Sequence, residues 1–144
     1  MFDSTNYSSD FPNYNSGCTD IWSVRVLYIG EGRLFEGLRV ASQPQFRYVK
    51  IRLAYVYQGS GRAELYPNTV VLVCFDPSPL HGLARSPAMF RDEDTQQVAY
   101  LDVQSPILSV EAGTLHRATF VYEFHRNCRA FRLYFPGCEG IIIA

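Results

Sequence analysis

Apolar side chains recur at every second position along several stretches of this sequence, and that period constrains the fold more than any other feature. The longest stretch, residues 46–57, places Val49, Ile51, Leu53 and Tyr55 on one face. Successive side chains of a β-strand point to opposite faces, so a period of two is typical of a strand with one buried side. No stretch shows a convincing helical period. The sequence therefore predicts an all-β protein.

Several other stretches carry the same signal. They are residues 21–30, 68–76, 97–103, 107–110, 111–124, 128–135 and 140–144. The Pro-rich residues 76–94 between them are predicted to form a long loop. Residues 111–124 and 128–135 flank a tight turn and are predicted to form a hairpin. Some seven strands with turns at short intervals indicate an antiparallel sandwich.

The alternation also predicts which side chains form the core. In the stretch 68–76 both faces are apolar, which suits a central strand that is covered on both sides. The residues predicted to be mostly buried are Val49, Ile51, Leu53, Val71, Val73, Phe120, Tyr122, Phe131, Leu133 and Phe135.

The four cysteines are too few for a disulfide scaffold in a chain of 144 residues. Cys128 and Cys138 stand at the two ends of one predicted strand about 26 Å long, whereas a disulfide needs Cα atoms within about 7 Å. We therefore predict no bond between these two. Cys74, inside an apolar strand, is predicted to be a small buried hydrophobe. If a disulfide forms, Cys18 or Cys138 is the expected member, because both lie in predicted loops.

Residues 1–20 differ from the rest of the chain, since they are rich in Ser, Asn, Asp and Tyr and contain no Lys or Arg. A segment of this composition has too few apolar groups to pack by itself and must gain contacts outside itself to become ordered. We predict an extended N-terminal arm at residues 1–20 and a β-sandwich domain at residues 21–144. The arm is predicted to dock onto a neighbouring copy or a protein partner through its aromatic residues Phe2, Tyr7, Phe11 and Tyr14. The alternative is an arm that folds back on its own domain.

Charge and motifs exclude several classes of function. The formal net charge is −1, so the chain lacks the overall basic character that nucleic-acid binding needs. We find no nucleophile, phosphate-loop or metalloprotease motif, and we predict no catalytic residue, metal site or cofactor. His116 and His125 flank one predicted strand and lie too far apart to share a metal. The acidic stretch 91–97 supplies too few oxygen ligands for calcium without partners, and it is predicted to be a solvated loop.

One set of polar and aromatic residues suggests a ligand face instead. Arginine interleaved with aromatic rings can bind sugars, an acidic partner or a single nucleic-acid strand. The alternative is a solvated sheet face, or the second packed side of the sandwich. The residues of this predicted face are Tyr48, Lys50, Arg52, Arg117, Arg132 and Tyr134.

Two long segments carry a resemblance to a known family. FRYVKIRLAYVYQGSGRAELYPNTVVLVCFDPSPLHG resembles the core of certain immunoglobulin-like domains, in which a long strand, a small turn and a second strand are followed by Asp and Gly. LSVEAGTLHRATFVYEFHRNCRAFRLYFPG is similar to their closing part. These domains occur in secreted bacterial lipoproteins and surface antigens of unknown function. The resemblance covers residues 21–143 and implies an immunoglobulin-like β-sandwich without catalytic residues.

These observations lead to one functional prediction and one alternative. We predict a non-enzymatic structural or interaction protein that assembles through its N-terminal arm, as a homo-oligomer or with a protein partner, into a virion, filament or cell-surface assembly. The alternative is a secreted immunoglobulin-like module that binds carbohydrate or another small ligand. The sequence contains no apolar stretch of the ~20 residues that a membrane span needs and no recognisable signal peptide. A virion or extracellular location is favoured.

Overall fold

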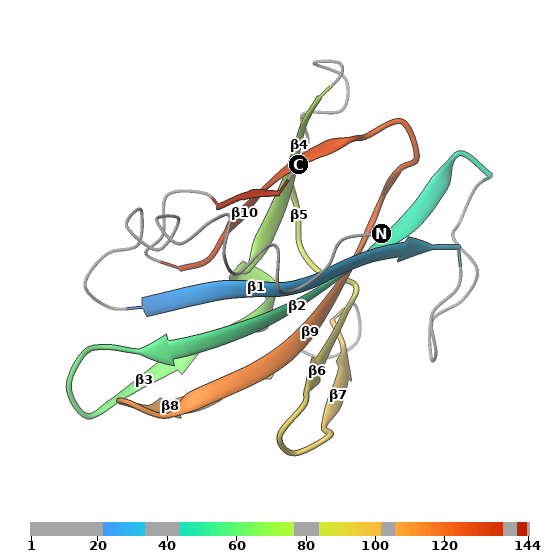
Figure 1. Ribbon diagram of the computed structural model, residues 1–144. Coiled ribbons are helices and arrows are strands. Elements are labelled where there is room, and N and C mark those ends of the chain that lie inside the picture. Colours follow the sequence, from blue (N-terminus) through green and yellow to red (C-terminus); the bar gives the residue numbers. More distant parts are fainter. Residues whose placement is uncertain (1–21, 34–43, 77–83, 102–105, 137–140, 144) are drawn as a thin grey trace.

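The computed structural model describes residues 22–33, 44–76, 84–101, 106–136 and 141–143, and almost all of its regular structure is β-strand (Figure 1). Its single helical element among these residues is one 3-10 turn, Pro67–Thr69. The all-β prediction is confirmed.

The strands form antiparallel sheets. The larger sheet has five strands in the order β1-β2-β9-β6-β7, and the smaller has four in the order β11-β10-β4-β5. A two-stranded ribbon pairs β3 with β8. The bounds are β1 Trp22–Gly32, β2 Phe46–Tyr57, β3 Arg62–Leu65, β4 Val71–Asp76, β5 Ala84–Arg85, β6 Met89–Asp92, β7 Val98–Tyr100, β8 Leu108–Glu111, β9 Leu115–His125, β10 Ala130–Tyr134 and β11 Ile141–Ile143.

The core lies between the sheets, because the inward residues of both form one cluster of buried side chains. Phe90 and Phe120 contact each other from neighbouring strands of the larger sheet, with ring centroids 5.1 Å apart. Tyr122 of β9 donates a hydrogen bond from its hydroxyl to the carbonyl oxygen of Val70, at 2.7 Å, just before β4 of the smaller sheet. Burial of that hydroxyl raises its pKa well above the ordinary value, so Tyr122 stays a neutral donor.

The prediction of core residues is mostly confirmed. Buried as predicted are Val49, Ile51, Leu53, Phe120, Tyr122, Phe131, Leu133 and Phe135. Val71 and Val73 are only half-buried, and the inward positions of β4 are Leu72 and Cys74. Since both faces of this strand are apolar, its period of two cannot tell which face points to the core.

The predicted hairpin between residues 111–124 and 128–135 is wrong. β9 pairs with β2 and β6, whereas β10 pairs with β4 and β11 in the other sheet. The turn between β9 and β10 therefore carries the chain from one sheet to the other. Apolar side chains of both strands still point into the core, and Phe124 contacts Phe131 edge to face with ring centroids 5.0 Å apart.

Cys74 of β4 forms a disulfide with Cys128, which lies in this turn between the sheets. The two Cα atoms are 6.0 Å apart, a distance typical of disulfides. Since Cys128 is bonded to Cys74, it does not bond Cys138, as predicted. The view of Cys74 as an unpaired buried hydrophobe is wrong. The expectation that Cys18 or Cys138 forms a disulfide is not tested here and stays a prediction. Cys18 and Cys138 themselves lie outside the described residues.

The predicted loop at residues 76–94 is also partly wrong. It contains β5 and β6, and β6 joins the larger sheet beside β9. Phe90, on β6, is one of the largest fully buried side chains. β6 has only four residues and is flanked by a proline-rich stretch and a charged turn. A strand of this length is too short for the alternation to be recognised in the sequence.

Large-to-small substitutions in the core should destabilise the protein strongly. We expect Phe120→Ala and Phe131→Ala each to lower the free energy of unfolding by about 3–5 kcal/mol, because each leaves a cavity in a packed interior. Urea unfolding measures this. Ile107→Ala, at a position 54% exposed, is the matched control and should change stability by less than about 1 kcal/mol. Equal losses at all three positions would contradict the core assignment.

Reduction of the disulfide should also weaken the fold. The bond closes a loop with a sequence separation of 54 residues, for which the loss of chain entropy in the unfolded state corresponds to roughly 4 kcal/mol. We expect thermal unfolding under reducing conditions to occur on the order of 10 °C lower. Non-reducing peptide mapping should recover the Cys74 and Cys128 peptides joined, and their recovery as separate peptides would refute the bond.

Candidate interaction surface

The outer face of the larger sheet carries Lys50, Arg52 and Arg117, three of the four basic residues that the sequence singled out. We use "outer face" for the side chains of β1, β2 and β9 that point away from the core, together with Glu93. They include Arg25, Tyr28, Tyr48, Lys50, Arg52, Ala54, Arg117 and Thr119. Strand register orders them into rows across the sheet: Arg25, Ala54 and Arg117 lie side by side, and Tyr28, Arg52 and Thr119 form the next row.

Arg52 is held by a charged network. Its Nε and Nη2 donate to the two carboxylate oxygens of Glu93 at 2.8 and 2.6 Å, and the Thr119 hydroxyl donates to the same carboxylate at 2.9 Å. The hydrogen bond from Arg52 lowers the pKa of Glu93, and the reciprocal bond raises the pKa of Arg52. Arg52 is therefore largely neutralised within the protein and is a weaker candidate for ligand binding than predicted.

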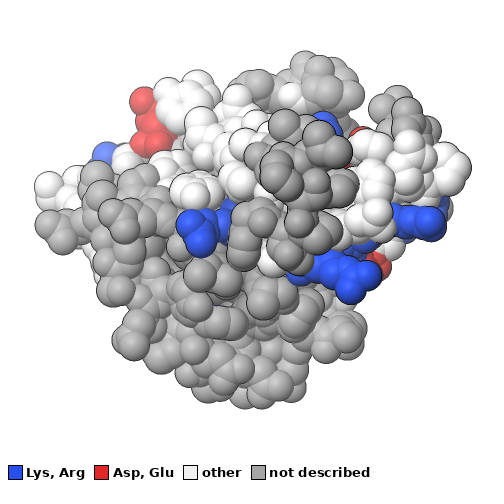
Figure 2. All heavy atoms as spheres, turned by 90° about the horizontal axis from the view of Figure 1, so that it is seen from above, with Lys and Arg blue, Asp and Glu red and all other residues white. Residues whose placement is uncertain are grey.

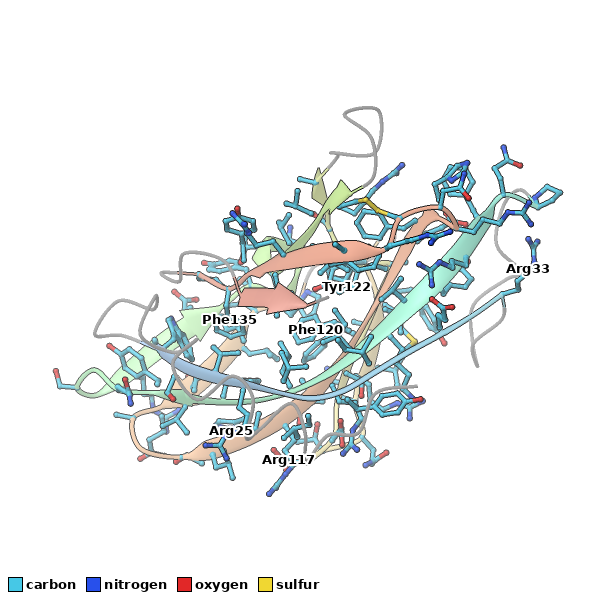
Figure 3. All side chains as sticks on the ribbon, turned by 45° about the horizontal axis from the view of Figure 1, so that its top comes forward. Arg25, Arg33, Arg117, Phe120, Tyr122 and Phe135 are labelled. Atoms are coloured by element: carbon cyan, nitrogen blue, oxygen red, sulfur yellow. A yellow bond between two sulfur atoms is a disulfide. The ribbon has the colours of Figure 1, made fainter. Side chains whose placement is uncertain are left out.

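Arg25 and Arg117 differ from Arg52, because both are exposed and no side-chain partner is recorded for either among the residues that the structure describes. Figure 3 shows both side chains pointing to the same side, away from Phe120 and Tyr122 in the core. Ala54 separates them, so their Cα atoms lie about 10 Å apart, two strand spacings. Arg25 was missed in sequence. Its position between the inward residues Val24 and Val26 indicates that Arg25 points outward. The sequence does not indicate which residues of the adjacent strands lie beside it.

Tyr48 and Lys50 belong to the outer face but are not free ligand contacts. Tyr48 is only 3% exposed and belongs to a second, small apolar cluster with Met89 and Val121. The Lys50 ammonium lies 5.9 Å from the centroid of the Tyr28 ring, within the range of a cation–π contact. Tyr48 is therefore a packing residue, which corrects the prediction for it.

Arg132 and Tyr134 are not part of this face. Both lie on β10 in the smaller sheet, so the predicted six-residue face is divided between two sheets. The cause is the wrong hairpin, since it placed β10 beside β9. Tyr134 is exposed and Arg132 is half-buried.

Within the acidic stretch 91–97, residues 91 and 92 end β6 and residues 93–97 form the turn to β7, so the predicted solvated loop is confirmed only for the exposed residues 94–97. Asp92 Oδ1 accepts the backbone N–H groups of Asp94 and Thr95 at 2.9 and 3.3 Å, which closes the turn. Asp94 Oδ2 lies 3.8 Å from His116 Nδ1, and the His116 ring stacks on Tyr55. The described residues contain no group of three acidic, His or Cys side chains that could hold a metal.

The outermost strands of the two sheets differ greatly in length. β1 ends the larger sheet and is 11 residues long, whereas the other three ends, β7, β11 and β5, have 3, 3 and 2 residues. Among the described residues β1 pairs on one side only, with β2, and its register shifts between Val26 and Tyr28. Trp22–Val26 therefore forms a regular five-residue edge.

Seen from above, the described Lys and Arg side chains lie in separate groups rather than in one continuous patch (Figure 2). None of the helical structure in the described part of the chain is long and apolar enough to cross a bilayer. The predicted arm anchors Phe2, Tyr7, Phe11 and Tyr14 lie outside the described residues.

No protein-family model matches the chain, and no curated protein matches it. Two solved structures are similar to it. One is an uncharacterized β-sandwich protein from Clostridium difficile 630, with a TM-score of 0.50, 13% identity and 83% coverage of both chains. The other is a candidate lipoprotein, ycdA, from Bacillus subtilis subsp. subtilis str. 168, with a TM-score of 0.56 and 11% identity; the match covers 88% of this chain and 37% of that one.

These likenesses establish the fold. The protein is an antiparallel β-sandwich, like the Clostridium difficile protein. The narrower resemblance to immunoglobulin-like domains stays a prediction.

The network around Glu93 should make stability depend on pH. A carboxyl whose folded pKa lies below its ordinary value of 4.5 stabilises the fold above that pH, and this contribution is lost as the pH falls through the lowered folded pKa. Glu93→Gln should therefore flatten the loss of stability below about pH 4.5. At neutral pH it should cost at most about 1 kcal/mol, because Arg52 is partly exposed and solvent screens the pair.

Urea unfolding between pH 2 and pH 7 measures this effect. Glu64→Gln, at an exposed position on β3, is the matched control. If both variants keep the acid dependence of the wild type, Glu93 is not the group responsible.

Proposed function

We propose that the protein is a non-enzymatic structural and interaction protein that assembles outside the reducing cytosol, with the arm of one copy adding as a strand to the β1 edge of another. The observation that carries this proposal is the length of β1. It has 11 residues, whereas the strands at the other three sheet ends have 3 residues or fewer. Sheet edges present unpaired N–H and C=O groups, and natural proteins keep most of them short for that reason.

The sequence of β1 supports its role as an acceptor. The strand contains no proline and no lysine, residues that commonly protect an edge from pairing. Its regular part, Trp22–Val26, is long enough for a short added strand, which is how extended peptides commonly bind sheet edges. The bulge after Val26 limits where such a strand can pair.

The Cys74–Cys128 disulfide supports a location outside the cytosol, because disulfides form and persist in oxidising compartments. The similarity to a candidate lipoprotein agrees with a cell-surface or extracellular setting. A virion surface meets the same chemical condition.

A second candidate is a secreted immunoglobulin-like module that binds a carbohydrate or another small ligand. It is favoured by the exposed guanidinium groups of Arg25 and Arg117 on one side of the larger sheet. A clean monomer at all concentrations would favour this candidate over assembly.

Removal of the arm should abolish assembly and leave the fold. We expect a variant lacking residues 2–17 to keep a β-type circular dichroism spectrum and cooperative unfolding, because the core lies in residues 22–135. Light scattering over a range of concentrations should show large species for the full chain and a monomer for the truncated one.

The matched control replaces residues 2–17 by a Gly/Ser segment of the same length, which keeps the chain length but removes the aromatic anchors. It should behave like the truncated protein. Oligomers of unchanged size in either variant would refute arm-mediated assembly. A monomeric full chain whose truncation only lowers the melting temperature would place the arm on its own domain.

A further inference from the structure

Two neighbouring rows of the outer face form a surface with a charged part and an aliphatic part. One row is Arg25, Ala54 and Arg117, from β1, β2 and β9. The next row, two residues along each strand, is Ser23, Val56 and Leu115. Leu115 is 47% exposed, and Ala54 and Val56 are half-buried, so an aliphatic strip lies beside two exposed arginines. We call these six residues the arginine–leucine surface.

Two acidic residues of the turn after β6 come close to Arg117 without pairing with its side chain. Glu93 donates its backbone N–H to the Arg117 carbonyl oxygen, but both of its carboxylate oxygens accept hydrogen bonds from Arg52. Asp94 accepts the backbone N–H of Arg117 at 3.3 Å. In the described part of the chain no ion pair is recorded for the guanidinium of Arg117 or for that of Arg25. Both charges are therefore available to a partner.

Two arginines on the same side of a sheet favour a partner that carries two anionic groups (Figure 3). Their Cα atoms lie about 10 Å apart, close to the Debye length in 0.1 M salt, so their repulsion is only partly screened. A guanidinium group has only donors and a carboxylate only acceptors, and the two can form a pair of parallel hydrogen bonds. A partner with two carboxylates relieves the repulsion and gains these bonds.

The other residues of the surface distinguish a protein segment from a saccharide or a nucleic acid. Sugar hydroxyls donate hydrogen bonds as well as accept them, but of the six side chains only that of Ser23 can accept one. Single-stranded nucleic acids bind by stacking their bases on aromatic rings, and none of the six residues is aromatic. The exposed side chain of Leu115 instead suits an aliphatic side chain of a partner.

We infer that the arginine–leucine surface binds an acidic segment of a protein partner. Two carboxylates of that segment pair with Arg25 and Arg117, and an aliphatic side chain between them lies against Leu115. This is a second interaction surface, and it does not depend on the proposed arm-mediated assembly. The saccharide-binding module, the second candidate for the function, is the alternative that the same experiment can reveal.

The test measures how a labelled helical peptide of Glu, Leu and Ala binds the full-length, disulfide-bonded protein, by fluorescence anisotropy at low salt. The two glutamates stand seven positions apart, which places them on one side of the helix about 10.5 Å from each other. A control peptide has Gln in place of both glutamates. We expect it to bind at least roughly tenfold more weakly, because the charge-assisted hydrogen bonds are lost.

Substitutions in the protein assign the binding to this surface. Arg25→Glu and Arg117→Glu should each raise the dissociation constant roughly tenfold, because an attraction becomes a repulsion. Leu115→Ser should raise it roughly threefold, because apolar contact area is lost. All three positions are exposed, so the melting temperature should stay at the wild-type value. The size of the assembled protein in light scattering should also stay unchanged.

Arg126→Glu is the matched control, with the same change of charge at an exposed position. Arg126 directly follows β9 and lies nine residues beyond Arg117, about 30 Å along the strand direction. Charges so far apart are screened from each other, so this variant should keep the dissociation constant within about twofold of the wild type.

Several results would overturn the inference. They are equal weakening by Arg126→Glu, which indicates unspecific attraction, no effect of Leu115→Ser, and no binding of the glutamate peptide at millimolar concentration. Binding of polygalacturonate through Arg25 and Arg117, without binding of the peptide, would overturn it in favour of the saccharide module. Assembly that survives deletion of residues 2–17 would overturn the arm proposal alone, because the peptide measurement does not use the arm.

Discussion

The turn between β9 and β10 determines how the two sheets face each other. Within about five residues the chain leaves the centre of the larger sheet and enters the smaller one. Three interactions connect this turn to other parts of the chain: the Cys74–Cys128 disulfide, the hydrogen bond from Arg47 to the Cys128 carbonyl oxygen and the bond from the Arg126 N–H to the carbonyl oxygen of Gln45. They tie β4, β2 and the turn together. The contact between Phe124 and Phe131 joins the strands on either side of this turn at the same end of the core.

The alternation of apolar residues predicted the strands well where the alternating stretch was long. It did not predict which strands are neighbours in a sheet. β2 and β9 were recognised because each carries eleven or more residues of alternation. The pairing of β10 could not be deduced, because a tight turn is compatible with a hairpin and with a change of sheet. That error placed Arg132 on the wrong face, and it left Cys74 unrecognised as the partner of Cys128. Disulfide pairing depends on distances between strands, and alternation within a strand contains no such distances.

The same limit applies to the outer face. Sequence identified Arg52 and Arg117 as outward residues, but Glu93, from the turn after β6, neutralises Arg52. Glu93 is 41 residues away in sequence and was predicted to be part of a solvated loop. A paired arginine contributes to stability, whereas an unpaired one is available to a partner, so the strand register decides which residue has which role. Arg25 becomes important for that reason, although nothing in its local sequence distinguishes it from Arg52.

An arm that adds to a sheet edge also limits the symmetry of the assembly. The donor segment and the acceptor edge are different surfaces, so a contact from one copy to the next is heterologous, and a series of such contacts closes into a ring or extends as a filament. Reciprocal exchange of two arms closes a dimer instead. The arm joins the domain directly before Trp22, at the start of its own β1, and twenty extended residues span at most about 70 Å. That reach permits either geometry. The choice therefore depends on the rotation that relates neighbouring sandwiches.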